Sequence, residues 1–288
     1  DRGTKMAQKT VLILPNLTKN NTGQLVKSIV SQLRFSGCTP VMQEAYDGQF
    51  ENVRYAPFDT LIAACDLVLT VGGVGTILHG VKHAVEHDKP VLGVNTGRLG
   101  YLAQVEADEI RILSRLAADD YAIQQRMLLE IRVGEDGEPL YALNDVVISK
   151  GDLARMVDLD ISGDGQAIGS YRADGVILAT PTGSTAYSLS AGGPIVDPSI
   201  DTIIVTPICP HSLNDRAVLL SPRMRLRVQS RYINASDKIV VSVDGENVAL
   251  PGQKTPILIR MAEKTARFIS FPEKTFTMIL REKLKPRG

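Results

Sequence analysis

The stretch Asp66-Leu67-Val68-Leu69-Thr70-Val71-Gly72-Gly73-Val74-Gly75-Thr76 decides the fold of this chain. Its first half is rich in aliphatic and β-branched side chains, which predicts a buried strand. A glycine turn follows, and apolar residues at helical spacing begin with Ile77 and Leu78. A strand, a glycine turn and a helix point backbone N–H groups at one spot, where an anion such as phosphate can bind. A tight turn without a ligand uses the same residue types, so this stretch alone leaves both interpretations open.

The composition narrows the class of protein. The chain has 288 residues, with 32 Lys and Arg against 32 Asp and Glu, so its formal net charge is zero. This balance argues against a general attraction to nucleic acid or to membranes, and we expect neither as a partner. The three cysteines show no C-x-x-C spacing, and neither a membrane span nor a signal-peptide core is evident. We therefore expect a cytoplasmic protein with free thiols.

The first part of the chain alternates strands with helices. Apolar runs at residues 11–14, 67–71 and 91–94 predict buried strands, and helical patterns separate them. This rhythm predicts an α/β domain over residues 1–118, with a doubly wound parallel sheet. Ligands of such sheets bind at the carboxyl ends of the strands. Residues 72–76 and 95–100 each follow a strand and should face one crevice.

Beyond about residue 120 the apolar pattern changes to a period of two. Met127, Leu129 and Ile131 alternate with Arg126, Glu130 and other polar residues, which predicts a strand with one apolar and one polar face. Asp136-Gly137 is a hairpin signal. We expect an antiparallel, β-rich domain over residues 119–265. A short helix is expected at residues 276–285, in a C-terminal segment, 266–288, that returns to the first domain.

The most informative string runs from Arg172 to Pro194. It contains Asp174-Gly175 and then Thr180-Pro181-Thr182-Gly183-Ser184-Thr185-Ala186-Tyr187. Hydroxyl groups and exposed N–H groups suit the oxygens of ribose and phosphate, and Tyr187 can stack on a base. A polar turn that caps a short helix would contain similar residues. The large number of hydroxyl residues and glycines in this one string is what favours a binding site.

These motifs together resemble the NAD kinase family. The resemblance rests on Gly72-Gly73-x-Gly75-Thr76, on Asn95-x-Gly97-x-Leu99-Gly100, on Asn144-Asp145, on the string just quoted, on Pro207-Ile208-Cys209-Pro210-His211 and on Asp244-Gly245. It extends from about residue 11 to residue 271, in the family's order. It implies transfer of the γ-phosphate of ATP to the 2′-hydroxyl of the adenosine ribose of NAD, which gives NADP. It also implies ATP and a divalent metal such as Mg²⁺ as cofactors, and a homodimer or homotetramer.

The resemblance also implies the site residues. The residues expected to bind the dinucleotide are Val74, Gly75, His79, Asn144, Asp145, Arg155, Arg172, Asp174, Thr185, Ala186, Tyr187, Ser188, Leu189, Ser190, Asp244 and Glu246. The residues expected to form the ATP phosphate loop are Gly72, Gly73, Gly75, Thr76 and Asn95. No metal-ligating side chain is expected. His79, His83 and His87 recur every four residues, but no Cys or carboxylate follows at a zinc-binding spacing.

One position departs from the family. Val74 stands where the family has the aspartate proposed as general base, and valine cannot accept a proton. Loss of a positioned base costs about 10²–10⁴-fold in rate. From the resemblance alone, Val74→Asp should raise NADP formation by orders of magnitude.

Two other functions remain open. A protein of the same fold that binds NAD or NADP without turnover is favoured by Val74, and an assay for NADP formation separates it from a kinase. A lipid or sugar kinase that shares only the glycine turn is disfavoured by residues 174–194, and a panel of substrates decides. A Rossmann oxidoreductase lacks support, because no G-x-G-x-x-G follows the first strand.

Overall fold

The computed structural model describes residues 8–97, 100–151, 155–231 and 238–285. The chain divides into two compact units. Unit 1 comprises residues 1–125 and 266–288, and unit 2 comprises residues 126–265. Unit 1 is an α/β structure with a parallel sheet, and unit 2 is built from antiparallel strands, which confirms the predicted fold class. Within the described ranges, no helix combines the length and the apolar character that a membrane span requires.

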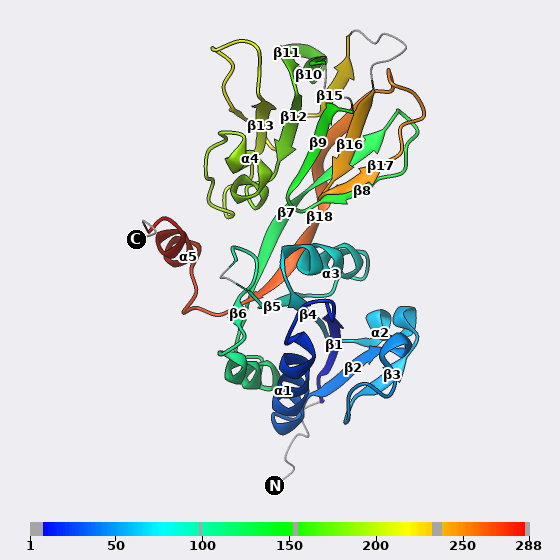
Figure 1. Ribbon diagram of the computed structural model, residues 1–288, viewed down its shortest axis with the longest axis vertical. Coiled ribbons are helices and arrows are strands. Elements are labelled where there is room, and N and C mark those ends of the chain that lie inside the picture. The colour runs from blue at the N-terminus through cyan, green and yellow to red at the C-terminus, as the bar shows by residue number, and fades with distance from the viewer. Residues whose placement is uncertain (1–7, 98–99, 152–154, 232–237, 286–288) are drawn as a thin grey trace. The chain divides into compact units, whose positions relative to one another are not determined.

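Unit 1 is a parallel sheet with the strand order β3-β2-β1-β4-β5 (Figure 1). Its strands are β1 (Thr10–Pro15), β2 (Thr39–Gln43), β3 (Arg54–Ala56), β4 (Leu67–Gly72), β5 (Val91–Asn95) and β6 (Val105–Glu106). Its helices are α1 (Thr22–Phe35), α2 (Phe58–Ala64), α3 (Val74–Glu86) and α5 (Phe276–Lys283), with the 3-10 segments η1 (Glu44–Tyr46) and η2 (Ile110–Ala118). The order of the strands reverses between β1 and β4. Ligands of open parallel sheets bind outside the carboxyl ends of the strands at such a reversal.

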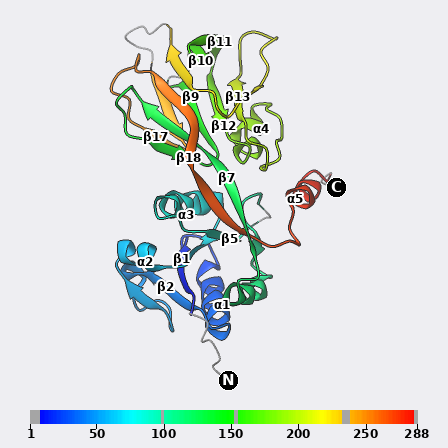
Figure 2. The same cartoon turned by 180° about the vertical axis from the view of Figure 1, so that it is seen from behind.

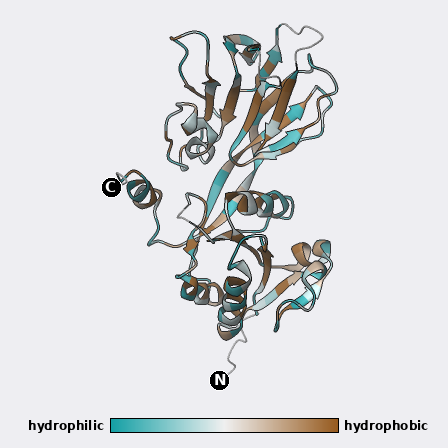
Figure 3. Cartoon of the chain, in the orientation of Figure 1, coloured by the Kyte–Doolittle hydropathy of each residue, from teal (hydrophilic) through white to brown (hydrophobic). Residues whose placement is uncertain are grey.

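Apolar side chains on both faces of the central strands form the core of unit 1. Every residue of β4 is buried, as expected for a parallel strand that is covered on both faces. Helix α1 turns Val26, Ile29 and Leu33 toward the sheet, at the spacing of one helix face. Figure 3 shows the hydrophobic colour along the strands.

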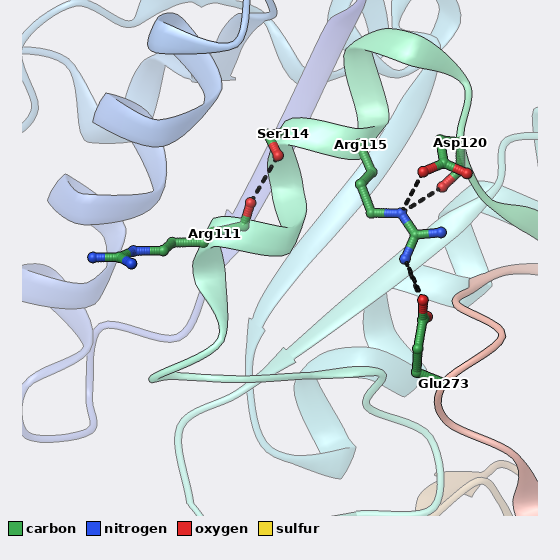
Figure 4. A network of polar contacts seen from close by, with 5 residues as sticks. All are labelled: Arg111, Ser114, Arg115, Asp120 and Glu273. Carbon is green, nitrogen blue, oxygen red and sulfur yellow. Dashed lines mark hydrogen bonds and ion pairs between the residues drawn. The ribbon is translucent and has the colours of Figure 1, made fainter.

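Arg115, on η2, attaches the C-terminal segment to unit 1 (Figure 4). Its Nη1 donates to the carboxylate of Glu273 at 3.0 Å, and its Nε donates to the carboxylate of Asp120 at 2.8 Å. The guanidinium carbon also lies 5.0 Å from the centre of the Phe271 ring. Within η2, the Ser114 hydroxyl donates to the carbonyl of Arg111 at 2.9 Å. Arg115 thus holds Phe271 and Glu273 of the C-terminal segment against η2.

Unit 2 contains a six-stranded sheet with the order β14-β13-β12-β9-β16-β17. Figure 2 labels β13, β12, β9 and β17 of this sheet. The strands that lie wholly in unit 2 are β8 (Leu140–Ala142), β9 (Asp145–Lys150), β10 (Val157–Gly163), β11 (Gln166–Ala173), β12 (Gly175–Ala179), β13 (Ile203–Ile208), β14 (Val218–Leu220), β15 (Leu226–Ser230), β16 (Ile239–Val243) and β17 (Glu246–Val248). Strands β7 (Ala122–Val133) and β18 (Ile257–Ser270) contribute residues to both units. Two short helical pieces, η3 (Gly183–Thr185) and α4 (Tyr187–Ser190), follow β12. The ladder pairs of β9 with β12 and β16 are all antiparallel.

The structure differs from the predicted alternation in β7. Arg126 and Glu130 were expected on a polar face, yet only 8% and 5% of their surfaces are exposed. Glu130 tolerates burial because Arg132 and Arg260 both donate to its carboxylate, at 2.9 Å each. Burial works to raise the pKa of Glu130, but these two hydrogen bonds lower it overall. A paired carboxylate can therefore occupy a place that the sequence pattern assigns to solvent.

The turn after β7 also differs in detail. The residue with positive φ is Gly134, at 81°, whereas the hairpin signal was Asp136-Gly137. Gly137 is instead required by close packing, because a Cβ there would lie 2.4 Å from the carbonyl oxygen of Val133. Both glycines are needed, for two separate reasons.

Candidate active site

The glycine turn joins β4 to α3 with no side-chain cap. Gly73 is the N-cap residue in extended backbone, and α3 begins at Val74. The first N–H groups of a helix have no partner within the helix, so they are available to an anion. Gly72 is needed because a Cβ there would lie 2.3 Å from Oγ1 of Thr76. The turn can therefore present backbone donors to a phosphate group.

The loop after β5 lies beside this turn. Asn95 pairs with Gly72 across the β4–β5 ladder, and the N–H of Thr96 donates to the carbonyl of Gly72 at 3.3 Å. The prediction that these two loops share one end of the sheet is confirmed. Asn95 shapes its own loop, because its Oδ1 accepts the N–H of Gly97 at 3.2 Å and its Nδ2 donates to Glu106 at 3.4 Å. Residues 98–99 of the family motif lie outside the described residues.

Lys19 is a site residue that the sequence argument missed. It lies in the loop between β1 and α1, at the reversal of strand order, and is exposed. Its Nζ is 2.7 Å from the point where a Cβ on Gly73 would stand. No ion pair or hydrogen bond is found for the Lys19 side chain in the part of the chain that the structure describes. A basic residue in the first strand-to-helix loop was the available signal.

Three buried oxygens at the end of β5 lack hydrogen-bond partners among the described residues. They are the hydroxyl of Thr96, Oε1 of Gln104 and Oε1 of Glu106. Burial raises the pKa of Glu106, against the opposing hydrogen bond from Asn95. Unpartnered buried acceptors are costly, so groups of this kind point to a ligand or to water. The oxygens lie at the same end of the sheet as the glycine turn.

Val74 and His79 lie on α3 behind the turn. The Val74 side chain is a surface group, with 48% of the residue exposed. The His79 ring contacts the His83 ring edge-on, with 4.8 Å between centroids, and His83 contacts Phe58 in the same way. Burial, and then the charge of His79, lowers the pKa of His83. No group of three or more His, Cys, Asp or Glu side chains that could hold a metal occurs among the residues described.

In unit 2, Asn144 and Asp145 form the centre of the predicted dinucleotide site. Asn144 precedes β9 and Asp145 is the first residue of that strand, and only 7% and 6% of their surfaces are exposed. Within the described ranges, neither side chain has a hydrogen-bond partner. A buried amide and a buried carboxylate without partners are poised to bind the hydroxyl groups of a ligand.

Asp244 fixes the backbone of this pair. It occupies the turn between β16 and β17, with φ of 47°, followed by Gly245 at 84°. Its Oδ1 accepts the N–H of Asn144 at 2.8 Å and that of Asp145 at 3.1 Å, and its Oδ2 accepts the N–H of Leu143 at 2.8 Å. The carboxylate that the resemblance assigned to the dinucleotide thus has three backbone donors of its own.

The electrostatic environment of Asp145 is unusual. Burial raises its pKa from 3.8 to about 7, and the nearby charge of Asp244 adds to the increase. Burial also raises the pKa of Asp244, against the three backbone N–H groups. The pair therefore holds one carboxyl group that gains or loses a proton near neutral pH.

The hydroxyl-rich string packs directly on Asn144. Ala179 pairs with Asp145 across the ladder, and the N–H of Thr180 donates to the carbonyl of Asn144 at 2.9 Å. The hydroxyl of Thr180 donates to the carbonyl of Leu143 and accepts the N–H of Gly183. A Cβ on Gly183 would lie 2.0 Å from the carbonyl oxygen of Asn144, so only glycine fits.

The residues after Gly183 present a mixed surface on η3 and α4. Tyr187 and Leu189 are 47% and 37% exposed. Thr185 and Ala186 are half-buried and Ser190 is exposed. Ser188 differs from these predicted contacts, because it has no exposed surface and its hydroxyl shares a hydrogen bond of 2.8 Å with Thr206.

Other predicted contacts lie elsewhere in unit 2. Asp174 precedes β12, and its carboxylate forms an ion pair of 2.6 Å with Lys150, at the far end of β9 from Asp145. Arg172, near the end of β11, is exposed beside it. Five residues of strand lie between Asp174 and Thr180, so the two are six steps apart, or about 20 Å at ~3.3 Å per residue. Arg155 and Glu246 are exposed, the first before β10 and the second at the start of β17.

Sequence comparisons identify the family. The sequence models of the ATP-NAD kinase N-terminal and C-terminal domains match residues 11–121 and 143–271. The chain belongs to the NAD kinase family. It is 40% identical to the NAD kinase of Symbiobacterium thermophilum, over 90% of this chain and 92% of that protein. It is 43% identical to the NAD kinase of Heliobacterium modesticaldum, over 76% of this chain and 78% of that protein.

Solved structures agree with this assignment. A yeast NADH kinase complexed with NADH superposes with a TM-score of 0.85 at 27% identity, over 98% of this chain and 89% of that one. An NAD kinase from Archaeoglobus fulgidus in complex with ATP has the same fold, with a TM-score of 0.74 at 24% identity, over 97% of this chain and all of that one.

Proposed function

We propose that this chain transfers the γ-phosphoryl group of ATP to the 2′-hydroxyl of the adenosine ribose of NAD, giving NADP and ADP. The observation that carries the proposal is the pair Asn144 and Asp145, two buried polar side chains without partners in the described structure. An amide and a carboxylate side by side can donate to and accept from adjacent ribose hydroxyls. Membership in the NAD kinase family supports the same assignment.

The phosphates of ATP are proposed to bind at the glycine turn. The open N–H groups at the start of α3 and the ammonium group of Lys19 converge there and supply donors and positive charge. Mg²⁺ is proposed to enter with ATP, held by the phosphates, because Mg²⁺ keeps several waters and needs few protein ligands. Bound there, the metal would neutralise charge on the transferring phosphate.

The dinucleotide is proposed to extend from Asn144 and Asp145 along η3 and α4. Tyr187 offers an exposed ring on which a base can stack, and Leu189 adds apolar surface. Gly183 packs closely on Asn144, and this contact joins the Asn144–Asp145 pair to the η3 and α4 segment. Ser188 is best understood as a support for α4, because its hydroxyl is used internally.

A homodimer or homotetramer is proposed for the assembled enzyme. Arg172 and Asp174 are both predicted to contact the dinucleotide. Asp174 lies about 20 Å from Thr180 along β12, and Arg172 precedes it on β11. If they contact NAD, a second copy of the chain is the natural source of them. Mixing inactive Asp145→Asn and Asp174→Ala variants should then restore activity in hybrid oligomers. A monomeric mass in light scattering would contradict the assembly.

A non-catalytic binding protein is the second candidate function, and Val74 is the observation that favours it. The test is NADP formation by the purified chain with NAD, ATP and Mg²⁺, together with calorimetry for NAD. Turnover supports the kinase. Binding of NAD without any turnover supports the binding protein. Absence of NAD binding contradicts both. A cytoplasmic location is proposed from the lack of paired cysteines, since Cys38 and Cys65 are buried thiols.

A further inference from the structure

We propose that Asp145 is the catalytic base of this enzyme, accepting the proton of the ribose 2′-hydroxyl as that oxygen attacks ATP. The proposal rests on the proposed function, because it names the proton acceptor for that same reaction. The base would then come from unit 2, because the glycine turn of unit 1 has a valine at the position of the family's proposed base.

The step balances without a further reactant. The ribose 2′-oxygen forms a bond to the γ-phosphorus of ATP, and the bond from that phosphorus to the β–γ bridging oxygen breaks. ADP leaves with the electron pair of the broken bond. The hydroxyl proton moves to a carboxylate oxygen of Asp145 and passes to solvent when NADP departs. Phosphoryl transfer depends mainly on positioning and electrostatics, and one positioned base suffices for the proton.

The groups around the glycine turn are poorly suited to this task. Val74 cannot accept a proton. Lys19 is a cation, which serves as a phosphate contact rather than as a base. The His79 ring lies against the His83 ring, one helical turn behind the loop. Among the described residues of unit 1 at this end of the sheet, two rivals to Asp145 remain. They are His79 and Glu106, whose Oε1 is buried without a partner and whose pKa is raised by burial.

Asp145 has the geometry that a base requires. Its side chain is almost fully buried and has no partner in the described structure, so an incoming hydroxyl would meet an unoccupied acceptor. Its main chain is held by Asp244 on one side and by the ladder to Ala179 on the other. Asn144 lies next to it and can hold a neighbouring hydroxyl. The acceptor is therefore preorganised, which reduces the cost of reaching the transition state.

The surrounding charges suit the same role. Burial and the charge of Asp244 raise the pKa of Asp145 to about 7, close to the pH at which a base works best. Glu246, at the start of β17, acts in turn on Asp244 and raises the pKa of Asp244 slightly further. An aspartate at position 74 would instead be half exposed in the first turn of α3, where the helix dipole keeps a carboxylate ionised and weakly basic.

The test compares the pH dependence of kcat for the wild-type chain and for two variants, at saturating NAD, ATP and Mg²⁺. The wild-type kcat should fall with acid below about pH 7. Asp145→Asn keeps the size of the side chain and should lower kcat by about 10²–10⁴-fold. Calorimetry should show that its NAD affinity changes much less than its kcat. Asp244→Asn removes a neighbouring charge and should move the acid limb of kcat to lower pH.

The Val74→Asp variant provides a second, independent test of the proposal. A base at Asp145 predicts a rise in kcat of less than about tenfold, well below the ~10²–10⁴-fold that a missing base would restore. The proposal is overturned if Asp145→Asn keeps its kcat, if its acid limb stays in place, or if Val74→Asp raises kcat by orders of magnitude. Loss of the acid limb in His79→Gln or in Glu106→Gln, but not in Asp145→Asn, would also overturn it. In these cases the wild-type chain still makes NADP and the proposed function stands. A wild-type chain that binds NAD and ATP but makes no NADP at any pH overturns both.

Discussion

Oδ1 of Asp244 accepts the backbone N–H of Asn144 at 2.8 Å and so ties the β16–β17 turn to the start of β9. The two residues are 100 positions apart in the chain. The same carboxylate accepts the N–H groups of Leu143 and Asp145. Charge-assisted hydrogen bonds to three consecutive N–H groups give the polar pair a fixed backbone, which leaves its side chains for the ligand.

Asp244→Ala should lower both stability and NAD affinity. The change leaves three backbone N–H groups without their acceptor and puts alanine at a φ of 47°. We expect the free energy of unfolding to fall by about 2–4 kcal/mol. Denaturant melts and NAD calorimetry measure the two effects. Asp244→Asn is the matched control, because asparagine tolerates positive φ and keeps one acceptor oxygen, so its loss of stability should be smaller. Equal stability of Asp244→Ala and wild type would contradict this role.

Gly183→Ala should displace Asn144. The added Cβ would stand 2.0 Å from the carbonyl oxygen of Asn144, so one of the two segments must move. Because precise placement of polar groups decides ribose binding, NAD affinity should fall about tenfold or more. Gly252→Ala is the control, since the nearest atom to its Cβ would be 3.6 Å away, at an ordinary contact distance. Unchanged NAD affinity in Gly183→Ala would show that the string and Asn144 do not act together.

Asp145→Asn should stabilise the unliganded protein in a pH-dependent way. The pKa of Asp145 is raised from 3.8 in an unfolded chain to about 7 in the folded protein. Between these values the folded state keeps a proton that the unfolded state has lost, so wild-type stability falls as pH rises through this window. The variant escapes this loss. Its gain in unfolding free energy should be larger at about pH 8 than at about pH 5, by on the order of 1–3 kcal/mol.

Thermal or urea melts at both pH values test this expectation. Asp136→Asn, in the exposed turn after β7, is the control for removal of one carboxylate without a change in the buried pair. A stability gain of Asp145→Asn that is the same at both pH values would mean that Asp145 is ionised throughout the window.

Lys19→Ala should weaken the binding of ATP more than that of NAD. The ammonium group lies beside Gly73 at the start of α3, where the phosphates are proposed to bind. A charge-assisted hydrogen bond to phosphate contributes about 1.5–3 kcal/mol, so the KM for ATP should rise about 10–100-fold. Lys27→Ala removes an exposed lysine from α1 and should leave both KM values unchanged. A rise in the KM for NAD alone would place Lys19 outside the ATP site.

Sequence patterns predicted β1, β4 and β5 of unit 1 because these strands are nearly all apolar and the glycine turn follows one of them. The juxtaposition of Gly72 and Asn95 followed from the parallel order of their strands and is confirmed. The contacts made by Asp244 and by Lys19 could not be predicted in this way. Each joins segments far apart in sequence, and local periodicity carries no information about which distant backbone group a side chain will meet. Ser188 shows the converse, because its hydroxyl faces Thr206 rather than solvent.

The most direct test of the account is NADP production by the purified chain, measured with NAD, ATP and Mg²⁺ at several pH values. The account predicts NADP at a rate that rises with pH to a plateau above about pH 7, as Asp145 loses its proton. It also predicts that Asp145→Asn reduces this plateau by about 10²–10⁴-fold. Binding of both nucleotides without formation of NADP at any pH would contradict the proposed activity.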